Sequence, residues 1–325
     1  MIICRTPLRM SFVGGGSDLP EYYRTKRGAV LSTSIKKYIY VSVNKKFDDD
    51  IRLSYSTTEI VNNVSNIKHP IVRNVLQYLK IEKGLEITSI SEIPSKGTGL
   101  GSSSSFTVGL IHALHSFINK DITKQELGKL SSFIEIDLCR DMIGKQDQYS
   151  ASYGGLNLIE FNEDETVKVT PLSVSSEIIK KIESSIILFF TGRTRNASNL
   201  LAKQSENLKK KDKRNLVSEM VDLAYDMKNL IENNEINCLG ELFDKNWKLK
   251  KQLAPEISNS EIDTIYNSGI KAGAKGGKLL GAGNGGFMMF YAAPEKHSEI
   301  TKAMKGLKKV SFSFDNAGSN IVFSD

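Results

Sequence analysis

The sequence has no apolar run that approaches 18 residues, and its first residues, MIICRTPLRMSF, lack the residue order and cleavage pattern of a secretory signal. We therefore expect a cytoplasmic protein with no membrane partner. Cysteine is also scarce, because only Cys4, Cys139 and Cys238 occur, far apart and without a C-x-x-C pair. This spacing excludes a disulfide framework and a cysteine-based zinc site, and we interpret all three as reduced, mostly buried thiols.

Nucleic-acid recognition motifs are absent as well, since no helix-turn-helix, RNP-like or zinc-finger spacing accompanies the net charge of +7. We therefore expect no nucleic-acid partner. The charge suits either an anionic small substrate or lysine-rich solubility. The densest basic run, 208–214, lies between two helix-like segments, where solvent exposure is its ordinary role. His112 and His115 are three residues apart but lack a carboxylate at ligand spacing, so we assign them no metal.

Hydrophobic periodicity predicts mixed helices and strands in the first half of the chain. Strands are expected where KKYIYVSVNKKF alternates and at 85–93, and a helix from the serines near 102 to about 119. Thr123 and Glu126 form a capping-box pattern. Leu127, Leu130, Ile134 and Leu138 then continue as the expected buried face of a second helix.

The second half changes character from about residue 177. One strand at SIILFFTG precedes helical patterns near 196–210, 215–233, 235–252 and 259–272, and strands return at GFMMFYAA, VSFSF and NIVFS. At 325 residues the chain is long enough for two ordinary domains. We predict an α+β protein with an N-terminal domain over 1–180 and a C-terminal domain over 181–325.

One segment, PSKGTGLGSSSSFTVG, combines alternating glycines with a run of serines ahead of a helix. Gly97, Gly99 and Gly101 remove side chains where a ligand must approach the backbone, and the helix N-terminus favours an anion. This pattern predicts a phosphate-binding loop, although a glycine turn followed by a serine cap is the alternative. The segment is neither a G-x-x-x-x-G-K-[ST] loop nor a dinucleotide fingerprint.

Two further glycine-rich motifs flank this loop in the chain, RTPLRMSFVGGGSDLPEYY at 5–23 and GGKLLGAGNGGFMMFY at 276–291. The content and order of the three motifs resemble the GHMP kinases, the superfamily of galactokinase, homoserine kinase and mevalonate kinase. The resemblance covers 5 to about 290, and G-L-G-S-S, at Gly99–Ser103, is its hallmark. Departures are small: Asn284 interrupts the third glycine run, and Ser104 and Ser105 replace frequent alanines.

The resemblance implies a two-domain fold, with an N-terminal domain like ribosomal protein S5 domain 2 and a C-terminal ferredoxin-like α/β sandwich. It also implies ATP and Mg²⁺ as cofactors. Ser103 and Glu135 match the metal ligands of the family. The expected ATP contacts come from the glycine-serine loop: Lys96, Gly97, Gly99, Leu100, Gly101, Ser102, Ser103 and Ser104.

For catalysis the resemblance points to Asp147 as the residue that takes the proton of the acceptor hydroxyl. Arg9 matches a cation that stabilises developing charge and keeps that carboxylate ionised. Whether such enzymes use a base or only electrostatic positioning is not decided by the sequence. Asp18 matches a hydroxyl-binding aspartate. The other expected substrate contacts are Arg5, Gly15, Gly16, Arg193, Arg195, Lys278 and Gly283. Among the basic residues, the candidates for binding a substrate phosphate are Arg193 and Arg195, with Lys278 and Lys96 as weaker ones.

Within the superfamily, the motifs GKQDQYSASYGG and FFTGRTR are most similar to sugar kinases that act on D-glycero-D-manno-heptose 7-phosphate. Galactokinases resemble the chain less, because they carry an acidic-histidine pair where Gly15 and Gly16 stand. The resemblance implies phosphorylation of the anomeric hydroxyl, in the supply of nucleotide-activated heptose for surface glycans. The alternatives are another acceptor such as fucose or galactose, a non-catalytic sugar-sensing regulator, or a nucleic-acid-binding protein. The sequence carries no signal for the oligomeric state.

Overall fold

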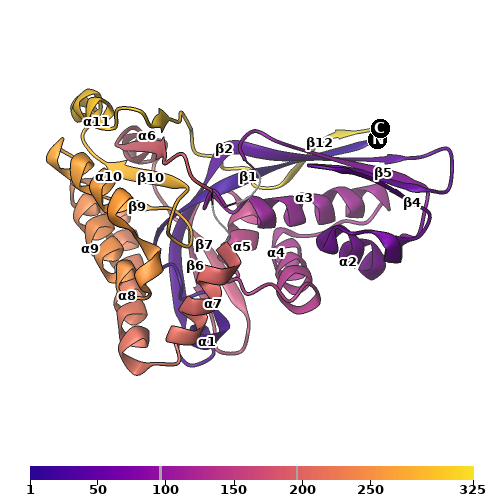
Figure 1. Cartoon of the computed structure of the whole chain (residues 1–325), viewed down its shortest axis with the longest axis horizontal. Coiled ribbons are helices and arrows are strands. Elements are labelled where there is room, and N and C mark those ends of the chain that lie inside the picture. Colours follow the sequence, from indigo (N-terminus) through magenta and orange to yellow (C-terminus); the bar gives the residue numbers. More distant parts are fainter. Residues whose placement is uncertain (95–96, 195–196) are drawn as a thin grey trace.

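The computed structural model describes residues 1–94, 97–194 and 197–325. Its first sheet is built on two long antiparallel strands, β1 (Ile2–Val13) and β2 (Gly28–Lys45), which run through the middle of the molecule (Figure 1). The sheet follows the order β12-β1-β2-β5-β3-β4, and the first part of β2 also pairs with β6. The other strands are β3 (Ile51–Ser54), β4 (Thr58–Val61), β5 (Leu85–Ser91), β6 (Leu156–Phe161), β7 (Val167–Pro171) and β12 (Asn320–Ser324).

Helices cover one face of this sheet (Figure 1). Helix α3 (Ser102–Phe117) lies against β1 and β2, and its inward residues, including Leu110 and Leu114, are fully buried. This buried apolar face stabilises the helix mainly by packing against the sheet rather than through intrinsic helix propensity. The other helices of this half are α1 (Pro20–Tyr23), α2 (Pro70–Leu79), α4 (Lys124–Ser132), α5 (Gln146–Tyr153) and α6 (Ser176–Ser184).

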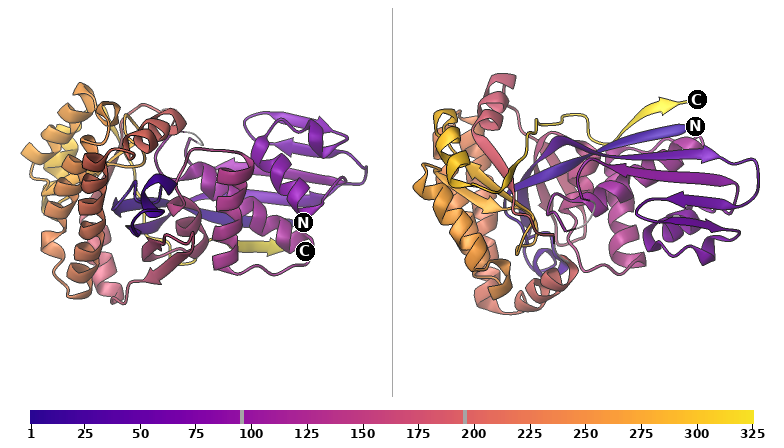
Figure 2. Two further views of the ribbon diagram at one scale, coloured as in Figure 1. Left: turned by 90° about the horizontal axis from the view of Figure 1, so that it is seen from below. Right: turned by 45° about the horizontal axis from the view of Figure 1, so that its top comes forward.

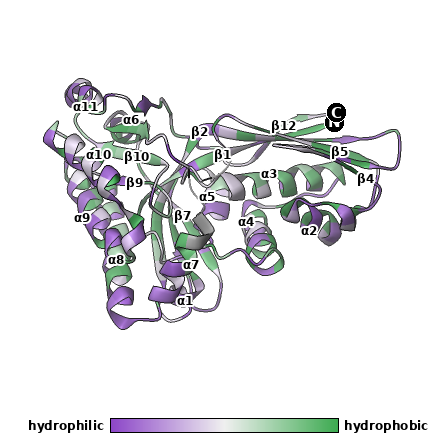
Figure 3. Cartoon of the chain, viewed as in Figure 1, coloured by the Kyte–Doolittle hydropathy of each residue, from purple (hydrophilic) through white to green (hydrophobic). Residues whose placement is uncertain are grey.

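The second sheet has the antiparallel order β11-β8-β10-β9. Helices α9 and α10 pack on it, whereas α8 packs on α9 and on β1, β2 and β6 of the first sheet, and the orange helices lie together at one end of the molecule (Figure 2). Its strands are β8 (Ile186–Phe190), β9 (Gly276–Leu279), β10 (Phe287–Tyr291) and β11 (Lys308–Lys309). The helices are α7 (Ala197–Asn207), α8 (Lys211–Glu232), α9 (Leu239–Lys251), α10 (Ser260–Lys271) and α11 (His297–Ala303). The strands of both sheets are mainly hydrophobic, whereas the lower end of α8 is hydrophilic (Figure 3). The basic run reaches the start of α8, where Lys209 to Lys211 are exposed and Lys213 and Arg214 are half-buried.

The predicted boundary between residues 180 and 181 falls inside α6 and stays a prediction. The C-terminal strand β12 returns to the first sheet, where it pairs with the start of β1. The strand predicted at VSFSF is wrong, because only Phe314 of that stretch makes a bridge, to Ile35. None of the helices in the described part of the chain combines the length and apolarity that a bilayer crossing requires.

Two further expectations need correction. The second predicted helix keeps α-helical geometry only to Ser132, and Phe133–Leu138 continue with π-helical bonding. The wider turn shifts the buried face, so Glu135 is fully buried and Leu138 is 39% exposed. The three cysteines are free thiols, but only Cys4 is buried; Cys139 is half-buried and Cys238 is exposed.

Candidate active site

A cavity of about 1110 Å³ lies where the glycine-serine loop, the glycine turn after β1 and the start of α5 meet the glycine loop after β9. Segments far apart in the sequence therefore form one site. Most of the predicted site residues line this cavity: Arg9, Gly15, Gly16, Asp18, Gly97, Gly99, Gly101, Ser102, Ser103, Ser104, Asp147 and Lys278. Lys96 and Arg195 lie outside the described residues.

The glycine-serine loop needs its three glycines for conformational reasons, since Gly97, Gly99 and Gly101 all have φ between +71° and +80°. Gly101 is the N-cap of α3 and supplies no side chain to cap the helix. The first amide groups of α3 and its dipole therefore face the cavity end of the loop and favour an anion. This geometry suits the binding of a phosphate group.

The third glycine motif holds this loop from the other half of the molecule. A Cβ atom at Gly99 would lie closer than 3.0 Å to the carbonyl oxygen of Leu280, and one at Gly286 equally close to that of Thr98. Backbone thus packs on backbone between 97–99 and 280–286. The position of the phosphate-binding loop depends on this contact.

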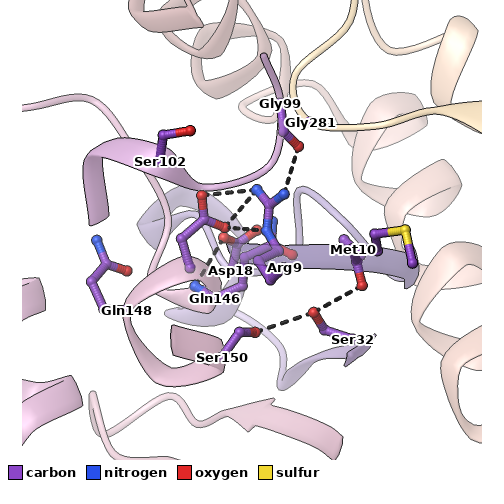
Figure 4. A network of polar contacts seen from close by, with 12 residues as sticks. Arg9, Met10, Asp18, Ser32, Gly99, Ser102, Gln146, Gln148, Ser150 and Gly281 are labelled. Carbon is purple, nitrogen blue, oxygen red and sulfur yellow. Dashed lines mark hydrogen bonds and ion pairs between the residues drawn. The ribbon is translucent and has the colours of Figure 1, made fainter. Parts of the chain in front are cut away.

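Arg9 joins the loop to the candidate catalytic carboxylate (Figure 4). Its Nε donates to Asp147 Oδ1 at 2.8 Å, one terminal nitrogen donates to Asp147 Oδ2 at 2.8 Å, and the other donates to Gly99 O at 2.6 Å. Its backbone amide also donates to Leu100 O. This forked pairing fixes both the carboxylate and the loop. Asp147 lies in the first turn of α5 and remains 23% exposed, within reach of a ligand in the cavity.

Asp18 lies in the cavity wall, directly after the glycine turn that follows β1. Its carboxylate accepts hydrogen bonds from the backbone amides of Gly16 at 3.1 Å and Gln146 at 3.3 Å. Burial raises the pKa of Asp18, and the nearby carboxylate of Asp147 raises it further. Gly144 packs directly on Asp18, because a Cβ there would overlap the carboxylate.

Glu135 and Ser103 form the candidate metal pair. Ser103 Oγ donates to Glu135 Oε1 at 3.3 Å, and Gln148 Nε2 donates to Glu135 Oε2 at 2.6 Å. Burial raises the pKa of Glu135 to about 7, and a cation bound beside the carboxyl would favour its ionised form. A hydroxyl and a carboxylate beside a phosphate loop match the hard oxygen ligands of Mg²⁺. In the described ranges, no three His, Cys, Asp or Glu side chains converge on a point that would suit a metal ion.

Five predicted residues lie outside the cavity lining. Arg5 stacks on the Tyr38 ring at 4.5 Å, and Arg193 forms an ion pair with Glu261 at 2.7 Å. Gly283 packs on Ile257. The remaining two are Leu100, a core residue, and Glu135, which lies behind Ser103.

Lys278 has a structural role that its sequence motif did not reveal. Its side chain is fully buried, and its ammonium donates to the carbonyl oxygens of Ser11 at 2.9 Å and Phe12 at 2.8 Å. Burial, with repulsion from Lys250 and Arg9, lowers the pKa of Lys278 well below its ordinary value. These bonds connect β9 to the end of β1.

The sequence reasoning missed several residues that line the cavity. Gln146 was visible within the GKQDQ motif, but Ser11 and Lys250 had no pattern of their own. At the other end of the cavity, Tyr55, His69 and Phe106 form a chain of ring contacts with centroids 4.9 and 5.2 Å apart. No motif had marked this aromatic wall.

Family models match two parts of the chain: the GHMP kinases N-terminal domain over 65–155 and the GHMP kinases C-terminal domain over 227–308. A D-glycero-alpha-D-manno-heptose 7-phosphate kinase of Campylobacter jejuni is 31% identical over 313 residues, which cover 93% of this chain and 92% of the relative. The chain belongs to the GHMP kinases. The predicted two-domain α+β fold and ATP-dependent small-molecule kinase activity are therefore confirmed.

Other GHMP kinases with different named substrates are also similar. A mevalonate kinase of Methanocaldococcus jannaschii is 30% identical over 250 residues, covering 75% of this chain and 74% of its own. A crystal structure of a D-glycero-D-manno-heptose 1-phosphate kinase from Bacteroides thetaiotaomicron superposes with a TM-score of 0.81 at 23% identity, covering both chains completely. The fold is thus shared among kinases with distinct acceptors.

Proposed function

We propose that this GHMP kinase transfers the γ-phosphoryl group of ATP to the anomeric hydroxyl of D-glycero-D-manno-heptose 7-phosphate, giving the 1,7-bisphosphate. The observation that carries the proposal is the Arg9–Asp147 pair, which joins the phosphate-binding loop to the Asp18 side of the cavity. The Campylobacter relative, named as a heptose 7-phosphate kinase, supports this acceptor. We place the reaction in the cytoplasm, where it would supply heptose for activation by a nucleotide.

The residues have distinct roles in the proposed transfer. The C1 oxygen forms a bond to the γ-phosphorus, the bond to the bridging oxygen of ADP breaks, and Asp147 accepts the hydroxyl proton. Arg9 holds the carboxylate and adds positive charge beside the phosphate loop. Asp18 accepts a hydrogen bond from a sugar hydroxyl. The anomeric hydroxyl is more acidic than an ordinary alcohol, so a modest base is sufficient.

Mg²⁺ would be held by Ser103 Oγ and Glu135 together with phosphate oxygens of ATP. When bound, it neutralises negative charge on the phosphates. The chain's own contribution is to keep the Glu135 carboxyl buried and hydrogen-bonded to Gln148, so that a bound cation would favour its ionised form.

The direct test is ADP release from Mg-ATP with a panel of acceptors: the heptose 7-phosphate, its unphosphorylated sugar, fucose, galactose, mannose, homoserine and mevalonate. The proposal predicts that the heptose 7-phosphate has the highest kcat/KM by at least about tenfold. Faster turnover of fucose or another free sugar would contradict the heptose 7-phosphate as acceptor and assign that sugar instead. No turnover of any acceptor would favour the sugar-sensing regulator.

A further inference from the structure

The acceptor end of the cavity contains a lysine that no motif marked. Lys250 comes from α9 and is 5% exposed, and its ammonium donates to the carbonyl oxygen of Gly281. A Cβ atom at Gly15 would lie 3.9 Å from Lys250 Nζ. The bare glycine therefore leaves the ammonium close to the cavity, beneath the turn that precedes Asp18.

A buried hydroxyl lies on the other side of the same glycine. Ser11 is 3% exposed, and within the described residues its Oγ atom has no hydrogen-bond partner. The same Cβ position at Gly15 is 3.8 Å from Ser11 Oγ. A buried hydroxyl left without a partner costs about 1–3 kcal/mol. Its place in the cavity wall points to a ligand atom as the missing partner.

The charges at this end favour an anion. Three basic side chains, Arg9, Lys250 and Lys278, line this part of the cavity wall together with the carboxyl groups of Asp18 and Asp147. Arg9 and Asp147 neutralise each other. The Lys250 and Lys278 hydrogen bonds described above go to carbonyl oxygens, which carry no formal charge. Basic groups therefore outnumber carboxyl groups in this part of the wall, and the lowered pKa of Lys278 makes Lys250 the lysine that would meet an anionic group.

We propose that Lys250 Nζ and Ser11 Oγ, on either side of the Gly15 turn, bind the phosphate group of the acceptor. This inference rests on the proposed sugar kinase activity and deepens it, because it names the residues that select a phosphorylated sugar. Lys250 and Ser11 take the place of two earlier candidates for the substrate phosphate. Arg193 is paired with Glu261, and the ammonium of Lys278 binds two carbonyl oxygens. The catalytic carboxylate then comes from α5, whereas the anion site combines Ser11 of β1 with Lys250 of α9, from the other half of the chain.

The γ-phosphate of ATP is the other phosphate that could reach Lys250, so the test must separate the two sources. The K250M variant, which keeps an unbranched side chain without the charge, is assayed with the heptose 7-phosphate and with the unphosphorylated heptose. We expect the ratio of the two kcat/KM values to fall at least about tenfold, because a charge-assisted hydrogen bond to phosphate is lost. We expect S11A to lower the same ratio about threefold. K248M, on the exposed side of α9, is the matched control.

Equal losses for both acceptors in K250M, with a raised KM for ATP, would assign Lys250 to the γ-phosphate and overturn the inference. An unchanged ratio would overturn it as well. Calorimetric titration of each variant with the heptose 7-phosphate, without nucleotide, gives a binding readout, and K250M should bind at least about tenfold more weakly. The proposed function fails separately, if the wild-type enzyme does not phosphorylate the heptose 7-phosphate at all.

Discussion

The two sides of the cavity are built from different material. The nucleotide side consists mainly of backbone, with glycines at positive φ and the contact between 97–99 and 280–286. The acceptor side consists of charged side chains, among them the buried Asp18 and Lys250 and the partly exposed Asp147. The nucleotide side therefore depends on the absence of side chains, and the acceptor side on their identity. This division explains how related kinases can share ATP binding while their acceptors differ.

Removing the carboxylate of Asp147 tests the junction of the two sides and should have the largest effect. We expect D147N to lower kcat by about 10²- to 10⁴-fold, because general-base assistance is lost while the shape of the side chain is kept. Steady-state kinetics with saturating Mg-ATP measure this effect. D164N, in an exposed hairpin turn, is the control. A loss smaller than threefold would remove Asp147 from the chemistry.

A methyl group at Gly99 tests the backbone side. In G99A a Cβ would meet Leu280 O, and we expect KM for ATP to rise at least about tenfold together with a lower Tm. Gly192 provides a matched control, because its φ of +79° nearly equals the +80° of Gly99 but nothing lies within 4 Å of its Cβ position. Both variants share the cost of about 1–2 kcal/mol for a left-handed residue. Equal ATP kinetics in the two variants would refute the backbone contact as the cause.

The buried carboxyl of Glu135 should make the stability of the protein depend on pH. The unfolded carboxyl ionises near pH 4.5, but the folded one keeps its proton to about pH 7, so the free energy of unfolding should fall as pH rises across this window. The loss is up to about 3 kcal/mol. E135Q should lack it and should exceed the wild type in stability at pH 8 without ligand. Denaturant unfolding at pH 5 and pH 8 measures the difference, and parallel pH profiles would contradict the assignment.

Substitution of Glu165 tests how far the acceptor side depends on contacts that lie outside the cavity. It accepts hydrogen bonds from Lys145 at 2.5 Å, Arg24 at 2.6 Å and Tyr23 at 2.8 Å, and Lys145 is the N-cap residue of the helix that carries Asp147. Burial opposes ionisation, but these bonds lower the pKa of Glu165 to about 2.

We expect E165Q to lower kcat less than about fivefold, since partly exposed ion pairs contribute at most about 1 kcal/mol. E177Q, in an exposed helical pair with Lys181, is the control and should be silent. If E165Q reduced kcat as much as D147N, the contacts of Glu165 would be essential to the site rather than a minor contribution.

The sequence predicted the parts of this molecule that depend on local pattern. Glycine spacing predicted a loop with positive φ angles that lines the cavity, and apolar periodicity placed α3 and α8 to α10 close to their observed bounds. Arg9 and Asp147 were paired only through resemblance, and the structure then placed them within hydrogen-bond distance.

Features that depend on distant contacts were not predictable. The return of β12 to the first sheet and the π-helical turn that buries Glu135 are set by packing. Lys250 lies in a lysine-rich stretch, KLKKQL, where only the facing glycine turn distinguishes it from its exposed neighbours. Lys278 looked like a substrate ligand because its motif lies beside the cavity, but its ammonium is committed to backbone carbonyls.

The central claim is that the new phosphate is attached at the anomeric carbon of a sugar that already carries one. Correlated ¹H–³¹P NMR of the product formed from the heptose 7-phosphate and Mg-ATP tests it directly. The account predicts two phosphorus signals, one of them newly coupled to the anomeric proton, with one ADP formed per sugar. A new phosphorus signal coupled to any other sugar proton would contradict the proposed transfer.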